Sequence, residues 1–336
     1  MAEAVTETEG AGAAANGSGV ALRTRLISTG ASVLALAIAV AFFSIKSDRF
    51  LSGPNFSLIL QQVMVLGTLA IGQTLIILTA GIDLSCGLVM AFASIVMTKL
   101  AVHNDVAPLL AIFLGLLAAT AFGALNGGLV TGLRLPPFIV TLGTFDIAYA
   151  LTHIYSNDQT ITNLPSAQTW LGTTFKLGST AIAYGSVLML VLFVVFAFIL
   201  RSTAGGRHIY AVGDNPEAAR LTGIHTSRVL LAVYSTAGLL YGVAALLLVG
   251  YTNTGDPQAG LTDNLDAITA VVIGGTSLFG GRGSVLGTLI GALLVGVIRN
   301  GLQLIGVDSI YQVLITGILV IAAVAVDQVA RGRLRR

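Results

Sequence analysis

Polar side chains are rare in this sequence, so the few that interrupt its apolar segments are the candidates for chemistry. Six of them carry amide or guanidinium groups: Gln61, Gln62, Gln73, Asn126, Arg299 and Asn300. These groups donate hydrogen bonds, and the amides also accept them, so they could bind the hydroxyl groups of a sugar. We expect them to line a substrate pathway. Hydrogen bonding between neighbouring helices is the alternative for each.

A carboxylate interrupts the stretch TAGIDLSCG, residues 79–87. A charge inside a membrane is costly and normally faces a cavity, a partner charge or a free helix end. Gly81, Asp83, Ser85 and Gly87 therefore form a candidate helix break, where Asp83 and Ser85 would cap the helix that follows. The break could move during transport, or it could be a fixed cap.

Arg299 is isolated within an apolar segment and needs a partner for the same reason. Asp146 and Asp266 are the candidates. Arg282, in the stretch GGRGS, most simply marks one end of a span, because arginines gather on the cytoplasmic side of membrane proteins.

The stretch GDNPEAARLTGI, residues 213–224, has the signals of a short helix. Asn215 is a natural N-cap, and Pro216 fits the first helical position. Glu217 suits the positive end of the helix dipole, and Gly223 can end the helix in a left-handed conformation. A helix of about seven residues is not stable alone in water, so this one must rest on another surface.

The elements that position these residues are predicted to be membrane-spanning helices. Of the 336 residues, 55% are hydrophobic and 10% are charged, against about 25% charged in a typical soluble domain. The apolar runs predict an all-α polytopic membrane protein with about ten spans. They are 26–45, 58–80, 86–102, 108–132, 137–155, 182–200, 229–250, 264–278, 285–304 and 310–329. Two of them, 86–102 and 264–278, are short and broken, and they could be partial spans.

The basic residues predict the orientation. With both termini in the cytoplasm, the internal segments hold 12 of the 17 Lys and Arg, which fits the positive-inside rule. Residues 1–20 lack large apolar side chains and are predicted to form a disordered cytoplasmic tail. The membrane domain covers residues 21–330 with a cytoplasmic loop at 201–228, and a basic cytoplasmic tail occupies 331–336.

A weak internal repeat links the two halves. Asn126-Gly127 and Asn300-Gly301 lie 174 residues apart, each in a glycine-rich segment, and the separation spans five predicted helices. An odd number of helices would invert one copy relative to the other in the membrane. Inverted repeats are typical of transporters whose pathway lies at the repeat interface.

Catalytic motifs are absent from the sequence. None of the three lysines, Lys46, Lys99 and Lys176, stands in the Gly-Lys-Ser/Thr order that a P-loop requires. The four histidines lack metal-ligand spacing, and Cys86 is the single cysteine. We therefore expect a protein that is not an enzyme, binds no cofactor or metal and has no nucleic-acid partner.

Three motifs, in this order and spacing, resemble one family: GIDLSCG, AVGDNPEAARLTGI and GGTSLFGGRGS. They are similar to the permease subunits of bacterial ABC importers for monosaccharides, in the ribose and fructose branch. The family usually has Val where this chain has Cys86. The resemblance implies a type II importer fold in the bacterial inner membrane. It also implies two copies of this chain, two cytoplasmic ATPase subunits that carry ATP and magnesium, and an extracytoplasmic sugar-binding protein.

The resemblance further implies that the short helix is the coupling helix, seated on the ATPase subunit. Its residues are Asp214, Asn215, Pro216, Glu217, Ala218, Ala219, Arg220, Leu221 and Gly223. The alternative function is a self-sufficient secondary sugar transporter or facilitator, which would have no need of such a helix. Fructose, ribose and related monosaccharides all remain open as the substrate.

Overall fold

A computed structural model describes residues 30–334 of the protein. The predicted tail at residues 1–20, the basic residues Arg23 and Arg25, and the last two residues lie outside the described part. A first helix, Gly30–Lys46, precedes α2. The later helices are α2 (Gly53–Leu78), α3 (Cys86–His103), α4 (Pro108–Gly132), α5 (Pro137–Ser156), α6 (Ser166–Thr169), α7 (Tyr184–Ser202), α8 (Ala204–Asp214), α9 (Pro216–Leu221), α10 (Thr226–Thr252), α11 (Asp263–Ile273), α12 (Val285–Leu304) and α13 (Ser309–Leu334).

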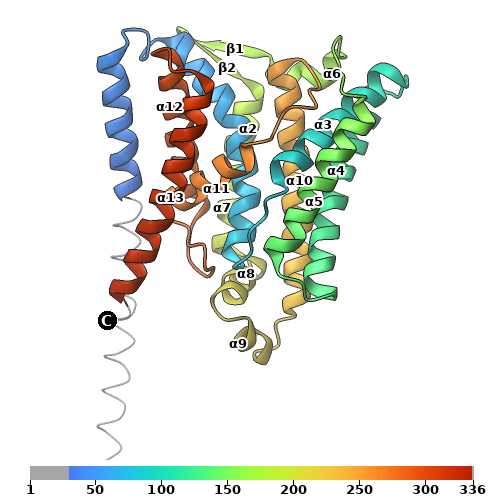
Figure 1. The fold of residues 1–336 in the computed structure, drawn as a ribbon, viewed down its shortest axis with the longest axis vertical. Helices are drawn as coiled ribbons and strands as arrows, with labels where there is room; N and C mark the ends of the chain where they lie inside the picture. Colours follow the sequence, from blue (N-terminus) through green and yellow to red (C-terminus); the bar gives the residue numbers. More distant parts are fainter. Residues whose placement is uncertain (1–29, 335–336) are drawn as a thin grey trace, which may run out of the picture.

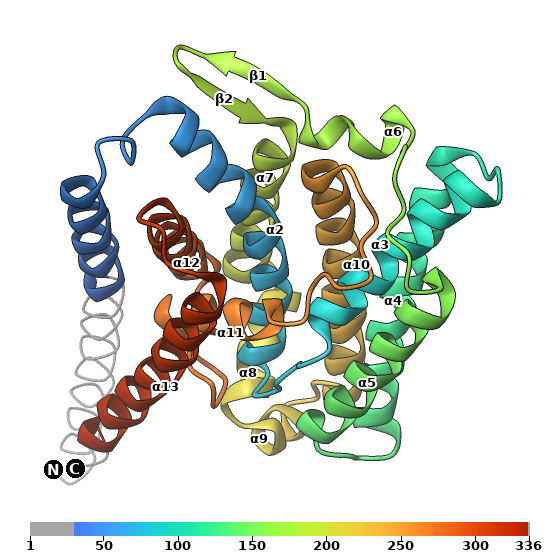
Figure 2. The same cartoon turned by 45° about the horizontal axis from the view of Figure 1, so that its top comes forward.

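The long helices pack around α2, with a short hairpin at one end of the bundle and α8 and α9 at the other (Figures 1 and 2). Every residue of α2 from Val63 to Leu78 is buried. The helix contacts α7, α10, α11 and α12. A helix with apolar side chains on every side is stable in this position because no face of it has to meet water.

Seven of the described helices are long and apolar enough to cross a membrane: α2, α3, α4, α5, α7, α10 and α12. The chain is thus a multi-pass, almost entirely helical membrane protein, as predicted. The apolar parts of the first helix and of α13, Gly30–Lys46 and Ser309–Ala322, are shorter. The total of ten spans therefore stays a prediction.

One of the two spans predicted to be short and broken does not form a full-length helix. The segment 264–278 forms α11, which has 11 residues and ends at Ile273. At 1.5 Å per residue, this helix reaches only about 16 Å, roughly half the hydrocarbon thickness. Gly275 follows with a positive φ of 85°, a conformation that other residues rarely adopt and that ends the helix.

The segment between α5 and α7 contains the only strands of the described residues. β1 (Thr174–Leu177) and β2 (Thr180–Ala183) pair as an antiparallel hairpin, and Gly178 in the turn has a positive φ of 63°. The start of this segment is attached to the chain that follows α10, because Ile161 and Gly255 form an isolated β-bridge.

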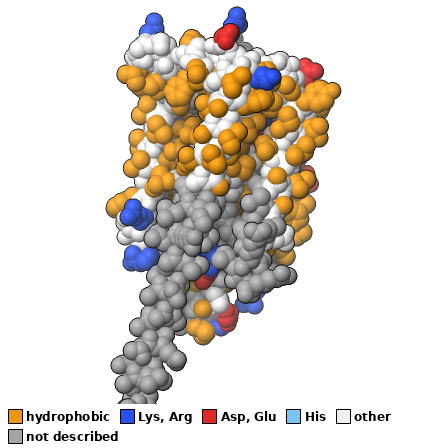
Figure 3. Space-filling view, turned by 90° about the vertical axis from the view of Figure 1, so that its left-hand side faces the viewer, with side chains coloured by type: hydrophobic (Ala, Val, Ile, Leu, Met, Phe, Trp, Pro, Cys, Tyr) orange, Lys and Arg blue, Asp and Glu red, His pale blue; other side chains and the backbone are white. Residues whose placement is uncertain are grey.

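The outer surface of the bundle is apolar across its middle. On the face shown in Figure 3, hydrophobic side chains cover the waist, and Lys, Arg, Asp and Glu lie mainly toward the two ends. Large apolar side chains such as Leu109, Val194 and Phe198 are exposed on α4 and α7. A lipid bilayer suits this pattern, since apolar side chains can face its hydrocarbon core.

The two halves of the chain run in opposite directions. α2 begins beside the hairpin, where the Ala181 amide donates to Ser57 Oγ at 2.9 Å, and it ends near Gly281. α10 begins after α9 and ends against Gly172 in the hairpin loop. Each is followed by a non-helical break and then by α3 or α11. This order agrees with the predicted inverted repeat.

Candidate functional site

The predicted short helix forms as α9, with the predicted caps. Asn215 Oδ1 accepts hydrogen bonds from the amides of Glu217 and Ala218 at 3.1 and 3.0 Å, and Pro216 occupies the first turn. Gly223 has a φ of 88°, and the Ile224 amide donates to the Ala219 carbonyl at 3.0 Å. The helix has six residues. Its conformation is therefore set by its own sequence.

α9 projects from the end of the bundle and is largely exposed (Figure 1). Arg220 Nη2 donates to Glu217 Oε1 at 2.8 Å, and both side chains face solvent. This hydrogen bond and the attraction between the two charges raise the pKa of the Arg220 guanidinium. Leu221 is 77% exposed, whereas Ala219 is buried against the rest of the protein. α9 is therefore a capped helix whose ion pair and leucine face solvent.

The end of α8 connects α9 to the membrane helices through close backbone contacts. Gly213, Gly280 and Gly281 pack around Leu78, and we call this cluster the glycine junction. The Gly281 amide donates to the Leu78 carbonyl at 3.0 Å. A Cβ placed on Gly213 would lie 1.8 Å from the same carbonyl oxygen, and one on Gly280 would lie 2.6 Å from the Gly213 carbonyl oxygen. Only glycines allow the three segments to approach this closely.

The predicted break between α2 and α3 lies directly after this junction. Asp83 is 1% exposed. Its Oδ1 accepts from the Ser85 amide at 2.8 Å and from Ser85 Oγ at 2.6 Å, and its Oδ2 accepts from the Tyr241 hydroxyl at 3.2 Å. The Ser85 side chain does not itself cap α3. Asp83 thus braces the break, and its carboxylate lies at the positive end of α3.

Four further helices hold the same break in place. Gln73 of α2 donates to the Asp83 carbonyl, and Asn126 of α4 donates to Ser85 Oγ at 3.1 Å. Thr141 of α5 donates to the Ile82 carbonyl at 3.1 Å, and Asn264 of α11 donates to the Leu84 carbonyl at 3.0 Å. These bonds satisfy polar groups that would otherwise be unpaired away from water.

The N-termini of α3 and α11 meet inside the protein. A Cβ placed on Gly87 would lie 2.2 Å from the Gly260 carbonyl oxygen, and one on Gly260 would lie 2.2 Å from the Gly87 carbonyl oxygen. Gly260 also has a positive φ of 80°. Discontinuous helices of this kind, with their ends in the protein interior, are typical of membrane transporters.

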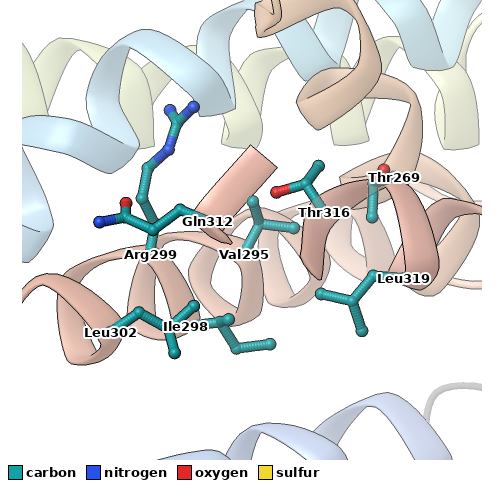
Figure 4. A pocket seen from close by; sticks show the side chains of 8 residues that line it. All are labelled: Thr269, Val295, Ile298, Arg299, Leu302, Gln312, Thr316 and Leu319. Atoms are coloured by element: carbon teal, nitrogen blue, oxygen red, sulfur yellow. The ribbon is translucent and has the colours of Figure 1, made fainter. Parts of the chain in front are cut away.

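Arg299 pairs with Asp266, which is one of the two partners that the sequence predicted. Arg299 Nη2 lies 2.7 Å from Asp266 Oδ2, and Nη1 lies 3.8 Å from Asp263 Oδ1. The other candidate, Asp146, is wrong: it lies exposed on α5. Figure 4 shows the cavity beside Arg299, which Gln312 and Thr316 of α13 also line. Its volume of about 10 Å³ holds one water molecule but no sugar.

The predicted pathway residues do not form one lining. Gln73, Asn126 and Asn300 are buried between helices, and Gln61 and Gln62 are half-buried. Gln73 Nε2 also lies 3.3 Å from Cys86 Sγ, a hydrogen bond that the family's usual valine would not make. The bonds of Gln73 and Asn126 are those of helix packing, which was the alternative for each residue. Their role in a pathway stays a prediction.

Sequence reasoning missed three residues that hold the break: Thr141, Tyr241 and Asn264. A signal for Tyr241 was present, because Tyr234 and Tyr241 are seven residues apart and lie on one face of α10. Both are fully buried, and a buried tyrosine hydroxyl usually finds a hydrogen-bond partner, as that of Tyr241 does in Asp83. No local signal pointed to Asn264, since its partner Leu84 is 180 residues away.

These features define a membrane transporter: a bundle of apolar helices, two helices whose N-termini meet inside the bundle, and an exposed short helix at one end. Residues 55–324 match the family described as the branched-chain amino acid transport system permease component. The chain belongs to this family, and it is the membrane permease subunit of an ABC importer, in which ATP hydrolysis is carried out by a separate subunit.

Relatives cover most of the chain. It is 43% identical to the fructose import permease protein FrcC of Rhizobium meliloti, over 88% of this chain and 83% of the relative. It is 41% identical to the ribose import permease protein RbsC of Bacillus subtilis, over 88% of this chain and 91% of the relative. The D-allose transport system permease protein AlsC of Escherichia coli is 35% identical, over 87% and 89%.

Proposed function

We propose that this chain forms the membrane pathway of an ATP-driven importer for a monosaccharide such as fructose or ribose. The names of its relatives support this substrate class. In the proposed assembly, two copies of the chain combine with two ATP-binding subunits and an extracytoplasmic sugar-binding protein. The pathway alternates between the two sides of the membrane as the ATP-binding subunits open and close.

The orientation we propose places α9 in the cytoplasm, together with both termini. The first described helix begins, and α13 ends, toward the same end of the bundle as α9 (Figure 1). Basic residues favour that end as the cytoplasmic one, because Arg201, Arg207, Arg220 and Arg228 all lie in or beside the loop that carries α9. The hairpin end then faces the sugar-binding protein.

The observation that carries the proposal is the position of α9 beside the glycine junction. α9 is exposed enough to dock, yet α8 connects it within a few residues to Gly213. From there the close contacts lead to Leu78 and on to the break that holds Asp83. A displacement of α9 would therefore reach the broken helix through backbone atoms that leave no free space to absorb it.

The test exchanges the two charges of α9. The double variant Glu217→Arg with Arg220→Glu keeps an ion pair within the helix but reverses the charges that it presents. We expect weaker association with the ATP-binding subunits and a loss of ATP-driven sugar uptake in vesicles. Lys176→Glu, an exposed charge change on the hairpin at the opposite end, serves as the control for association with the ATP-binding subunits, which it should leave unchanged. If association and uptake both survive the exchange, α9 is not the docking element.

A second arm tests the energy source. Vesicles that contain only this chain should show no concentrative uptake of radiolabelled D-fructose or D-ribose, whatever ion gradient is imposed. Uptake driven by a gradient without the ATP-binding subunits would overturn the proposed function in favour of a secondary transporter.

A further inference from the structure

Among the seven described spans there is one acidic side chain, Asp146 of α5. It lies near the middle of this 20-residue helix, about 14 Å from either end at 1.5 Å per residue. It is exposed on the surface of the single chain. A carboxylate is thus presented at mid-membrane depth on the outside of the bundle.

Asp146 has no ion pair within the described residues. The intramembrane arginine, Arg299, is already neutralised by Asp266 and Asp263 on another side of the protein. An ionised carboxylate that faces hydrocarbon is strongly unfavourable, and intramembrane carboxylates normally face water or a polar partner. Leu142 and Ile147 beside it are exposed apolar side chains, as on α7, so the carboxylate is the group on this surface that does not suit lipid.

The neighbours of Asp146 on this surface leave room for a ligand and offer it an aromatic ring. Gly143 is one turn earlier, and a Cβ placed on it would have nothing within 4 Å. Tyr149 is one turn later and 40% exposed, and its ring lies 4.3 Å from that of His153. Residues three apart share a helix face, so the open space, the carboxylate and the ring lie in line. We call Gly143, Asp146 and Tyr149 the Asp146 face.

The opposite side of α5 packs against the bundle, so the exposed position of Asp146 follows from how the helix is oriented. Thr141, Thr144 and Ala148, which are small, are buried against the bundle, whereas the Asp146 face points away from it. A helix that only faced lipid would carry its charged residue inward, where hydrogen bonds are available.

The groups of the Asp146 face suit a sugar. A carboxylate accepts hydrogen bonds from two hydroxyl groups at once, and an aromatic ring packs against the C–H face of a pyranose or furanose. The six residues predicted to line a pathway do not compete for this role, since three of them are buried between helices and the cavity beside Arg299 holds only one water molecule.

Building on the proposed function, we propose that the Asp146 face lines the aqueous passage of the assembled importer, and that Asp146 accepts hydrogen bonds from the hydroxyl groups of the monosaccharide in transit. The second copy of the chain closes the passage and shields this face from lipid.

The first experiment measures water access in the complete complex. In a Cys86→Val background, which removes the single native thiol, Asp146→Cys and Gly143→Cys are introduced separately. Charged methanethiosulfonate reagents react with thiolates, which form in water and not in hydrocarbon. Both variants should react about tenfold faster or more than Val194→Cys, an exposed mid-span position on α7. Equal, slow reaction at all three positions would overturn the proposal, whether lipid or the second copy covers the face.

The second experiment tests the contact with sugar. Asp146→Leu should lower ATP-driven uptake of radiolabelled D-fructose or D-ribose by about tenfold, because a hydrogen bond to a charged group is lost. Asp146→Asn, which keeps one acceptor oxygen, should lie between this variant and the wild type, and Val194→Leu should leave uptake unchanged. Undiminished uptake by Asp146→Leu refutes the sugar contact even if the face proves accessible to water.

The two proposals fail in different ways. If the wild-type complex takes up sugar only with ATP but the face is unreactive, the proposed function stands and this inference falls. If wild-type uptake needs no ATP-binding subunit, the proposed function falls, whatever the reactivity of the face.

Discussion

A methyl group at Gly213 should uncouple ATP hydrolysis from transport. In Gly213→Ala, the new Cβ would lie 1.8 Å from the Leu78 carbonyl oxygen and 2.7 Å from the Gly281 amide nitrogen. Ordinary contact begins at about 3.4 Å. The end of α8 and the end of α2 would therefore have to separate by roughly 1.5 Å, since both neighbours are backbone atoms and cannot rotate away.

The cost of this separation is about 1–3 kcal/mol, as for other groups forced into a filled interior. The fold should survive a loss of this size. The path from α9 to the break would be disturbed, however, because the Gly281 hydrogen bond to Leu78 lies in the displaced contact. A misplacement of about 1 Å can cost a large factor in a reaction step, so we expect uptake to fall about tenfold.

The assay compares ATP hydrolysis with sugar uptake in proteoliposomes that hold the complete complex. Gly213→Ala should retain assembly and hydrolysis while uptake falls, so more ATP is consumed per sugar. Gly205→Ala, in the same helix, is the matched control: its Cβ would meet only Thr203 Oγ1 at 3.7 Å, and uptake should be unchanged. If the two variants have the same ratio of ATP to sugar, the junction does not transmit the motion of α9.

Two further predictions concern contacts inside the bundle. Arg299→Met should lower the stability of the purified protein by about 3–5 kcal/mol, because it leaves Asp266, which is 1% exposed, without its charge partner. Thermal unfolding in detergent measures the loss, and the same variant combined with Asp266→Asn should recover part of it; no recovery would contradict the pairing. Gly87→Ala should lower the unfolding temperature, because its Cβ would lie 2.2 Å from the Gly260 carbonyl oxygen. Gly128→Ala, with nothing within 4 Å, should not, and equal unfolding temperatures would show that the half-helix ends are not in close contact.

The membrane spans and the local hydrogen bonds of helix caps could be predicted from the sequence. Helices such as α4, Pro108–Gly132, follow their predicted spans closely, because a run of apolar residues long enough to cross the bilayer must satisfy its backbone within the same segment. The caps of α9 were predictable for a related reason: Asn215 bonds to residues two and three positions away. The three family motifs likewise identified the class of protein.

The residue at which α11 ends and the hairpin were not predicted. The predicted span extended to residue 278, and the helix ends at Ile273 because Gly274 and Gly275 turn the chain toward the junction. The hairpin strands have four residues each, too short for a clear alternation of polar and apolar positions.

By itself, the sequence determined the class of protein, most of its spans and the short capped helix, because each depends on residues within one local window. Only the tertiary structure decided which distant groups meet. Leu78 contacts Gly213 and Gly281, Asn264 holds Leu84, and Arg299 takes Asp266 instead of Asp146. Polar groups in a membrane protein must find partners inside it, and close packing of the helices determines which partners are within reach. The same packing left Asp146 exposed on the outer face of α5.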